Sequence, residues 1–371
     1  MKLSVSSYEL QKCLGNISGV IPSKSTLPIL ENFLLELSGG ELTVTASDLE
    51  IFASVKMGVK GSEDGTIAIP AKRLMETIRA LPETTIVLSG DSGSNKIEMK
   101  TDSGVYRVTG ESSENYPSVP VFKEHEELQI DNETLRRLIN KTAFAASTDE
   151  LRPAMTGILF QIKPKEIRAI STDGHRLVKF TNSAFSSKNV EKDIIIPAKA
   201  LNLVVKCIED TPGIISLNGS QVKFNLGNIT LVSRMIDEKY PNYESVLPLE
   251  NDRKLVVNKN ELLSSVRRTA LYASSTTHLV RFSLNKNSVA VSAEDIDFGS
   301  EAKETLKCEY TSDPMEIGFN SFYVMDILSH LDTDEAVFML SSPSRAAIVK
   351  PAEQRAGEDL LMLVMPVRLN A

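Results

Sequence analysis

The chain repeats the stretch IPAKRL (residues 69–74) as IPAKAL (residues 196–201), 127 residues later. Pro70 and Pro197 fit the first turn of a helix, where a proline loses no backbone hydrogen bond. A degenerate third copy, GFNSFYV, lies at residues 318–324. Three copies at this spacing indicate an internal repeat with a period of about 125 residues.

A second segment also recurs in each repeat, as VSSYEL (residues 5–10), IDNETL (130–135) and VNKNEL (257–262). Ser6, Asp131 and Asn258 are of the residue types that cap helix N-termini. Glu9 and Glu261 follow three residues after the first and third of them, as in a capping box. Apolar residues then continue at helical spacing, so each repeat is predicted to begin with a helix.

Strand and turn patterns fill the space between the helices. Apolar and polar residues alternate at 41–46, 86–88 and 289–291, which is typical of half-buried strands. Turn signals separate such runs, at residues 39–40 (GG), 102–104 (DSG) and 218–219 (NG). Each repeat is therefore predicted to be an α+β domain, with an antiparallel sheet that faces helices on one side.

Proline-rich segments mark where one repeat meets the next, at residues 116–120 (YPSVP) and 240–248 (YPNYESVLP). We place the domain boundaries to give residues 1–121, 122–249 and 250–371, and the length of 371 residues allows two or three ordinary domains.

Composition indicates an ordinary cytoplasmic globular protein, 42% hydrophobic and 24% charged. No apolar run approaches the roughly 18 residues of a membrane span, and the N-terminus turns polar too soon for a signal peptide. Cys13, Cys207 and Cys308 are far apart and form no CxxC pair or zinc-ligand cluster with histidine. We therefore expect buried free thiols, no metal and no cofactor.

Charge is distributed unevenly along the chain, whose formal net charge is −8. The six segments predicted to be helical carry a net charge of +6, so the remainder carries −14. Basic residues on helices are often no more than a solvated face. In an acidic protein, a basic helix-lined surface also suits sequence-independent contact with DNA phosphates, while an acidic exterior repels DNA elsewhere.

Motifs for nucleotide binding and for catalysis are absent: the chain has no GxxxxGK[ST] loop, no GxGxxG after a strand and no GxSxG elbow. Asp173 and His175 in STDGHRL (residues 171–177) are candidates for a catalytic dyad, which would suit an enzyme of nucleotide metabolism. Gly174 between them instead favours a turn. Because no acid-base constellation surrounds the dyad, we predict a protein that is not an enzyme.

Several segments resemble bacterial sliding clamps, the beta subunits of DNA polymerase III, and the resemblance covers the whole chain. The segments are PIL (28–30), TASDLE (45–50), RPAMTGILF (152–160), STDGHRL (171–177), YPNYESVLP (240–248), EIGFN (316–320) and VMPVRL (364–369). The resemblance implies three clamp domains per chain, each with two helices inside and antiparallel sheets outside. It also implies a head-to-tail homodimer, closed into a six-domain ring that encircles duplex DNA and tethers the replicative polymerase.

The resemblance further implies a pocket for short peptide motifs of polymerase, clamp loader and repair proteins. Its residues would be Arg152, Met155, Thr172, Gly174, His175, Arg176, Leu177, Pro241, Val246, Asn320, Tyr323, Val364, Met365, Pro366, Val367 and Arg368. Leu177 and Val246 fit an ordinary hydrophobic core equally well. Ala154 stands where the family can have an aromatic residue and Ala346 where it can have serine, and Asn370-Ala371 extends the usual end. The preferred peptide is therefore left open.

For DNA, the resemblance favours Lys24, Arg73 and Lys199, and the charge pattern adds Lys72, Arg136, Arg137 and Lys141. We expect the dimer interface to involve Tyr106 and Val108 on an edge strand and Leu271 and Tyr272 at the end of a helix. The remaining alternative is a repeat scaffold that binds only proteins, which would show no topological retention on circular DNA.

Overall fold

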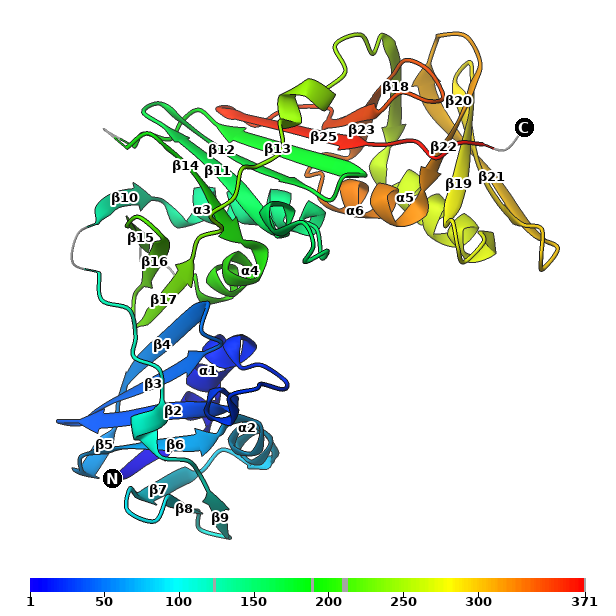
Figure 1. Ribbon diagram of the computed structural model, residues 1–371. Helices are drawn as coiled ribbons and strands as arrows, with labels where there is room; N and C mark the ends of the chain where they lie inside the picture. Colours follow the sequence, from blue (N-terminus) through cyan, green and yellow to red (C-terminus); the bar gives the residue numbers. More distant parts are fainter. Residues whose placement is uncertain (123–124, 188–189, 209–212, 370–371) are drawn as a thin grey trace. The chain divides into compact units, whose positions relative to one another are not determined.

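The computed structural model describes residues 1–122, 125–187, 190–208 and 213–369, and this part of the chain contains six α-helices (Figure 1). They are α1 (Ser7–Ile17), α2 (Ala71–Ala80), α3 (Asn132–Thr142), α4 (Ala198–Cys207), α5 (Lys259–Thr269) and α6 (Ser321–Ser329). Each lies within or nearly within a segment expected from the repeat. None of these helices is long and apolar enough to span a bilayer.

Two of the three predicted N-caps are confirmed. Asp131 Oδ1 accepts a hydrogen bond from the Thr134 amide at 2.8 Å, and Asn258 Oδ1 accepts one from the Glu261 amide at 3.0 Å. For Ser6 only the position is confirmed: it is the N-cap residue of α1, but its side chain makes no capping hydrogen bond. Ser6 is the last residue of a strand and pairs with Thr85, so the helix starts directly from the sheet.

The placement of the two prolines also needs a correction. Pro70 and Pro197 end strands, and α2 and α4 start one residue later. Pro70 is the N-cap of α2, with φ −53° and ψ 112°. The proline ring fits this position as well, because the N-cap amide needs no partner inside the helix.

The strands form three sheets, in which every pairing between named strands is antiparallel, as predicted. The first has the order β5 (Lys60–Glu63), β1 (Lys2–Ser6), β7 (Thr85–Asp91), β8 (Lys96–Lys100), β9 (Val105–Thr109). The second has the order β10 (Glu126–Ile130), β15 (Gly213–Leu217), β16 (Gln221–Leu226), β17 (Ile229–Arg234), β4 (Ile51–Gly58), β3 (Glu41–Ser47), β2 (Asn32–Ser38), β6 (Gly65–Pro70).

The third sheet has the order β14 (Lys192–Pro197), β11 (Gly157–Lys163), β12 (Glu166–Thr172), β13 (Arg176–Asn182), β25 (Glu358–Val364), β24 (Ala347–Pro351), β23 (Glu335–Leu340), β18 (Arg253–Asn258), β21 (Ser300–Tyr310), β20 (Ser288–Asp295), β19 (Leu279–Asn285), β22 (Met315–Asn320).

The chain divides into two compact units. One holds residues 1–136 and 199–235, and the other holds residues 137–198 and 236–371.

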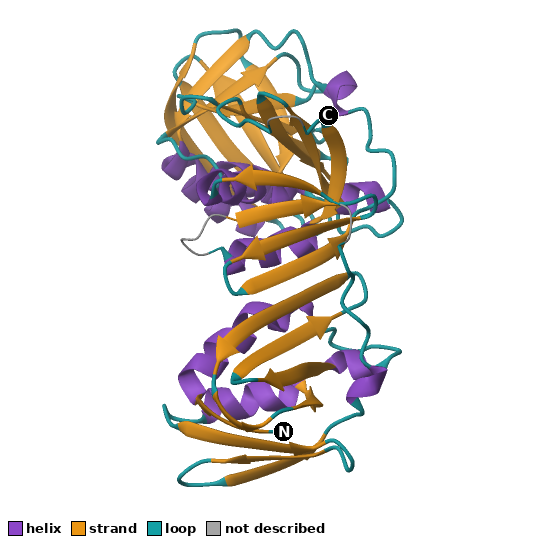
Figure 2. Ribbon diagram, turned by 90° about the vertical axis from the view of Figure 1, so that its left-hand side faces the viewer, coloured by secondary structure: helices purple, strands orange, loops and turns teal. Residues whose placement is uncertain are grey.

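Within each unit the helices lie on one side of the strands, as Figure 2 shows. Apolar side chains of α1 such as Leu10, Leu14 and Ile17 are buried, and so are Leu262 and Val266 of α5. Burial of such faces at roughly 25 cal/mol per Å² is the main stabilising contribution of short helices. The polar faces of the helices remain available for charged side chains.

Repeats are joined by strand pairing. Strand β17, the last strand of the second repeat, pairs with β4 of the first, where Ile229 lies opposite Val55. Strand β25, the last strand of the third repeat, pairs with β13 of the second, where Arg176 lies opposite Val364. The same pairing thus recurs at two successive junctions.

Candidate functional site

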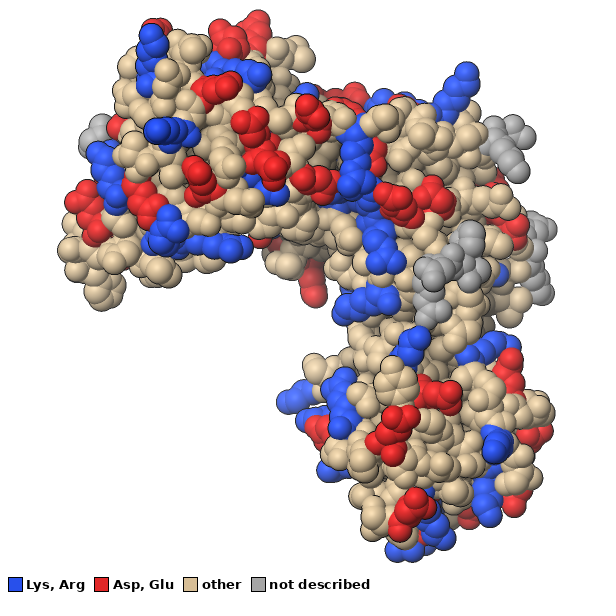
Figure 3. All heavy atoms as spheres, turned by 180° about the vertical axis from the view of Figure 1, so that it is seen from behind, with Lys and Arg blue, Asp and Glu red and all other residues tan. Residues whose placement is uncertain are grey.

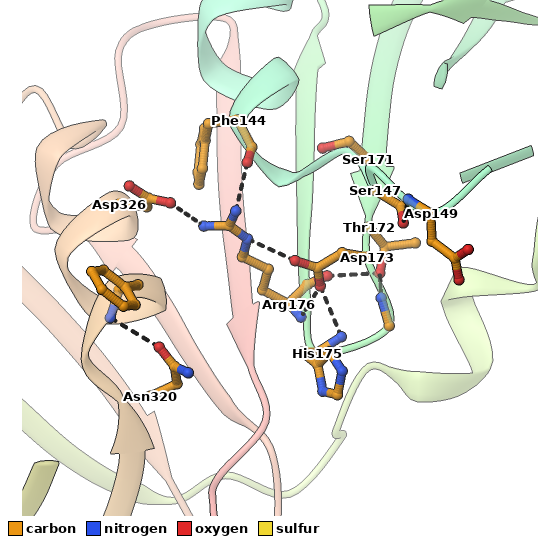
Figure 4. Close-up of polar contacts among 12 residues, drawn as sticks. Phe144, Ser147, Asp149, Ser171, Thr172, Asp173, His175, Arg176, Asn320 and Asp326 are labelled. Atoms are coloured by element: carbon orange, nitrogen blue, oxygen red, sulfur yellow. Dashed lines mark hydrogen bonds and ion pairs between the residues drawn. The ribbon is translucent and has the colours of Figure 1, made fainter. Parts of the chain in front are cut away.

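A tight turn between β12 and β13 forms the centre of the predicted peptide site (Figure 4). Asp173 Oδ1 accepts hydrogen bonds from the amides of His175 and Arg176, both at 2.9 Å. Thr172 Oγ1 accepts one from the Gly174 amide at 3.1 Å and donates one to the Arg176 carbonyl at 2.6 Å. The turn predicted from Gly174 is therefore confirmed.

Gly174 is required in this turn. Its φ of +91° is a conformation that side chains disfavour. A Cβ at this position would also lie 3.1 Å from the Arg152 guanidinium and 3.7 Å from Met155 Cε. Arg152 and Met155 therefore lie against the turn, where the prediction grouped them.

Arg176 holds the turn against two other segments (Figure 4). Its Nε binds Asp173 at 3.1 Å, its Nη1 makes a short bond to Asp326 of α6, and its Nη2 donates to the Phe144 carbonyl at 2.7 Å. The guanidinium also lies over the Tyr323 ring, 4.8 Å from the centroid. Since Arg176 is only 9% exposed, it positions the site and offers little surface to a ligand.

The C-terminal segment passes beside the turn. The Met365 amide donates to the His175 carbonyl at 2.8 Å, and the Val367 amide donates to the Gly318 carbonyl at 2.9 Å. Strand β25 ends at Val364, two residues before Pro366, whose nitrogen has no hydrogen to donate to a neighbouring strand. The last two residues, 370–371, lie outside the described residues.

Exposure divides the predicted pocket residues into surface and core. Met365 is 41% exposed and Val246 is 53% exposed, and Pro241, His175 and Arg368 are also exposed. By contrast, Leu177 and Val364 are 2% and 0% exposed and belong to the core. Arg152 and Gly174 are exposed as well, and Arg176 is buried. The other members are half-buried or buried: Met155, Thr172, Asn320, Tyr323, Pro366 and Val367.

Ala154 and Ala346 belong to the apolar cluster beneath this surface. Ala346 is buried with Leu177, Tyr240 and Leu363, and Ala154 packs against the cluster. A larger residue at either position would change the volume of the cluster. These two alanines are thus placed to influence the shape of the surface above them.

Asp173 and His175 do not have the arrangement of a catalytic dyad. Both Asp173 oxygens are engaged by the amides of the turn and by Arg176 Nε. The His175 ring stacks on Tyr323, with ring centroids 5.9 Å apart and planes at 17°. Among the described residues, no cluster of three or more His, Cys, Asp and Glu side chains could hold a metal ion.

The predicted DNA-binding cations fall into two groups. Lys24, Lys72, Arg73, Arg136 and Lys199 have exposed side chains. Arg136 Nη2 donates to the Ile208 carbonyl at 3.1 Å, and Lys199 Nζ lies 2.5 Å from Asp48 Oδ2. Figure 3 shows cations and anions interspersed on one face.

Arg137 and Lys141 form the second group, whose charged side chains are largely buried. Arg137 binds Glu358 and Asp332, and its side chain is 14% exposed. Lys141 is 7% exposed, and its Nζ lies 2.6 Å from Asp332 Oδ1. Their charges are already paired with Glu358, which is 11% exposed, and Asp332, which is 39% exposed, so phosphate contact would require those ion pairs to break.

Sequence reasoning missed the acidic partners of Arg137, Lys141 and Arg176. Asp326, Asp332 and Glu358 lie far along the chain from the basic residues that they bind. The sequence held one indication that Asp326 has a basic partner: Asp326 gives α6 a net negative charge, and α6 alone among the six helices has one. The positions of Asp332 and Glu358 carried no comparable signal.

Comparisons with known proteins agree with this architecture. Family models of the DNA polymerase III beta subunit match its N-terminal domain to residues 1–120, its central domain to 129–242 and its C-terminal domain to 244–368. The beta sliding clamp of Synechococcus elongatus is 30% identical, and the match covers 100% of both chains.

The chain belongs to the beta sliding clamp family. It is a DNA sliding clamp, a non-enzymatic factor of DNA replication with a three-domain fold of antiparallel sheets and few helices. A sliding clamp from Bartonella birtlesii, crystallised with griselimycin, matches with a TM-score of 0.93, 30% identity and complete coverage of both chains. A clamp from Pseudomonas aeruginosa matches with a TM-score of 0.89 and 28% identity, again over both whole chains.

The residues predicted for the clamp's dimer interface lie beside two unpaired strand edges. Among the described strands, β9 pairs only with β8, and it carries Tyr106, which is 38% exposed, and Val108, which is half-buried. Leu271 and Tyr272 are 82% and 44% exposed, on a short 3-10 helix (Ala270–Tyr272) after α5. Near that helix, β21 pairs with β18 only at residues 308–310, so residues 300–307 have one free edge.

Proposed function

We propose that two copies of the chain close head to tail into a ring around duplex DNA. In this ring, β9 of each copy adds to the free edge of β21 of the other. Each chain contributes three domains, residues 1–121, 122–249 and 250–371, and the ring acts in the cytoplasm. A separate clamp-loader ATPase opens it, because the chain has no phosphate-binding loop of its own.

The single observation that carries the proposal is the unfinished strand pairing of the repeat. The last strands of the second and third repeats, β17 and β25, pair with β4 and β13 of the repeat before each. The last strand of the first repeat, β9, has no such partner, and β21 of the third repeat lacks the matching strand. A second copy supplies both missing partners, and a head-to-tail contact that closes gives a ring.

Basic helices support the DNA side of the proposal. Within their observed bounds the six helices carry a net charge of +7, whereas the whole chain carries −8. Lys24, Lys72, Arg73, Arg136 and Lys199 are the exposed members of the predicted set. Side chains of this kind contact phosphates without reading base sequence, which suits a ring that slides.

The surface around the β12–β13 turn supports a further proposal, which concerns the binding of partner proteins. We propose that short peptide motifs of the polymerase catalytic subunit, the loader and repair proteins bind here. Exposed Pro241, Val246 and Met365 offer apolar contacts, and exposed Arg152 and Arg368 offer charge. One short motif is expected to bind with a dissociation constant on the order of a micromolar, and two sites per ring would add avidity.

A charge placed at each edge tests the ring. The variant Val108→Glu with Tyr272→Glu puts carboxylates on both sides of the proposed interface, where burial would oppose association. We expect sedimentation to give twice the 40.7 kDa chain mass for the unmodified protein and a single chain mass for the variant. Open polymers, or a variant that stays dimeric, would contradict this interface. A monomeric scaffold that binds only proteins would show neither dimer nor retention on DNA.

A further inference from the structure

The hairpin between β20 and β21 ends in two of the most exposed large apolar side chains of the described residues. Ile296 is 86% exposed and Phe298 is 84% exposed. Single exposed apolar residues are common, but two on one five-residue tip form a small apolar knob. We call residues 295–299 the hairpin tip.

The hairpin tip has a preorganised conformation. Asp295 is 8% exposed, and its Oδ1 accepts hydrogen bonds from the amides of Asp297 at 3.0 Å and Phe298 at 3.3 Å. Gly299 closes the turn with φ +62°. Below it, β20 and β21 pair without a bulge from Asp295–Ser300 to Ser288–Lys307. A fixed turn on a regular hairpin presents its side chains at low entropic cost.

Antiparallel addition of β9 to β21 determines what the tip meets on the second copy. The two strands run in opposite directions, so the C-terminal end of β9, at Thr109, faces the N-terminal end of β21, at Ser300. The hairpin tip immediately precedes Ser300. With the ends of the two strands aligned, the hairpin tip extends beside Thr109 of the other copy.

A cavity of about 540 Å³ lies at that end of β9. Met1, Ile97 and Val108 contribute apolar surface to its lining. The charged lining residues are of both signs: Lys96, Arg107, Glu63, Asp91 and Glu98. Pockets of roughly 300 Å³ or more accept substantial side chains or ligands. Lys96 has no acidic partner among the described residues, and the exposed carboxylate of Asp297 on the tip could supply one.

We infer that the hairpin tip of one copy inserts Phe298, flanked by Ile296, into the cavity at the end of β9 of the second copy. The occupant is thus a second copy of this chain, and the contact rests on the proposed head-to-tail ring. It adds an apolar anchor to a junction otherwise made by strand pairing. A buried aromatic residue of this kind is a frequent energetic centre of protein interfaces.

Tryptophan fluorescence tests the location of the tip directly, because the chain contains no tryptophan. In Phe298→Trp, the indole is expected to emit at short wavelength in the dimer. When Phe298→Trp is combined with Val108→Glu and Tyr272→Glu, which separate the dimer, its emission should shift to the longer wavelength of an exposed indole. The matched control is Leu249→Trp, since Leu249 is 97% exposed and belongs to neither β9 nor β21, and its emission should stay red-shifted in both backgrounds.

Dimer affinity provides the second measurement. Phe298→Ser is expected to raise the dimer dissociation constant at least tenfold, whereas Leu249→Ser should leave it unchanged. A solvent-exposed indole at position 298 in a verified dimer, or an unchanged affinity of Phe298→Ser, would overturn the inference while the ring stands. An edge variant that remains dimeric would instead overturn the ring itself. Normal dimers of Phe298→Ser that load poorly on DNA would assign the tip to the loader or DNA, against the inference.

Discussion

Arg176 shows how one side chain organises the peptide surface without being part of it. It was predicted as a pocket residue from the resemblance alone, but the structure buries it between Asp173, Asp326 and the Phe144 carbonyl. Removing one member of such a buried ion pair leaves the others uncompensated. The residue identity could thus be predicted from sequence, whereas its role depended on Asp326, 150 residues away.

For this reason Arg176→Ala is expected to lower the free energy of unfolding by roughly 2 kcal/mol, as for the loss of charge-assisted hydrogen bonds, and to abolish peptide binding. The control is Arg152→Ala, because Arg152 is 47% exposed and its pair with Asp149 should contribute at most about 1 kcal/mol. Urea denaturation and peptide titration measure the two effects. Equal loss of stability in both variants would contradict the positioning role.

His330 makes the stability of the same region depend on pH. Its ring stacks on Phe144 with centroids 3.9 Å apart, and burial lowers the pKa of His330 although a hydrogen bond to the Asp326 carbonyl opposes this. A lowered folded-state pKa means that the unfolded chain binds the proton first, so stability is complete above about pH 6.5 and falls below it. In urea denaturation between pH 8 and 5, His330→Gln should lose less stability than the unmodified protein. Parallel profiles would refute this.

At the scale of elements, the repeat and its helix caps could be predicted because they depend on local sequence. The six helices, the alternating strands and the turn at Gly174 all follow from neighbouring residues. Ser6 is the N-cap residue of α1 without a capping hydrogen bond, whereas Asn258, which also ends a strand, makes one. Which strands keep a free edge depends on distant pairing, so β21 could not be recognised from its own sequence.

The C-terminal segment is an element whose role can be tested by deletion. Val364 closes the core, but Met365 and Val367 contribute only two backbone hydrogen bonds to the rest of the fold. Deletion of residues 365–371 should therefore abolish peptide binding and leave the dimer and thermal melting nearly unchanged. Melting well below that of the full chain would show that the segment completes the core, and normal melting with undiminished peptide affinity would remove it from the site.

At the scale of the whole molecule, retention on DNA depends on closure of the proposed ring and not on any one contact with DNA. Exposed cations such as Lys24 and Arg73 attract DNA weakly and are screened by salt. A closed ring instead remains on DNA because the duplex passes through it, so its lifetime on DNA should depend on whether the DNA has free ends. This distinction separates a sliding clamp from a scaffold that binds only proteins.

The decisive measurement loads the protein onto nicked circular DNA with a bacterial clamp loader and follows retention after gel filtration in high salt, before and after the circle is cut. We expect the protein to remain on the circle and to leave rapidly once the DNA is linear. The Val108→Glu, Tyr272→Glu variant should not be retained on either. Equal retention on circular and linear DNA would contradict encirclement.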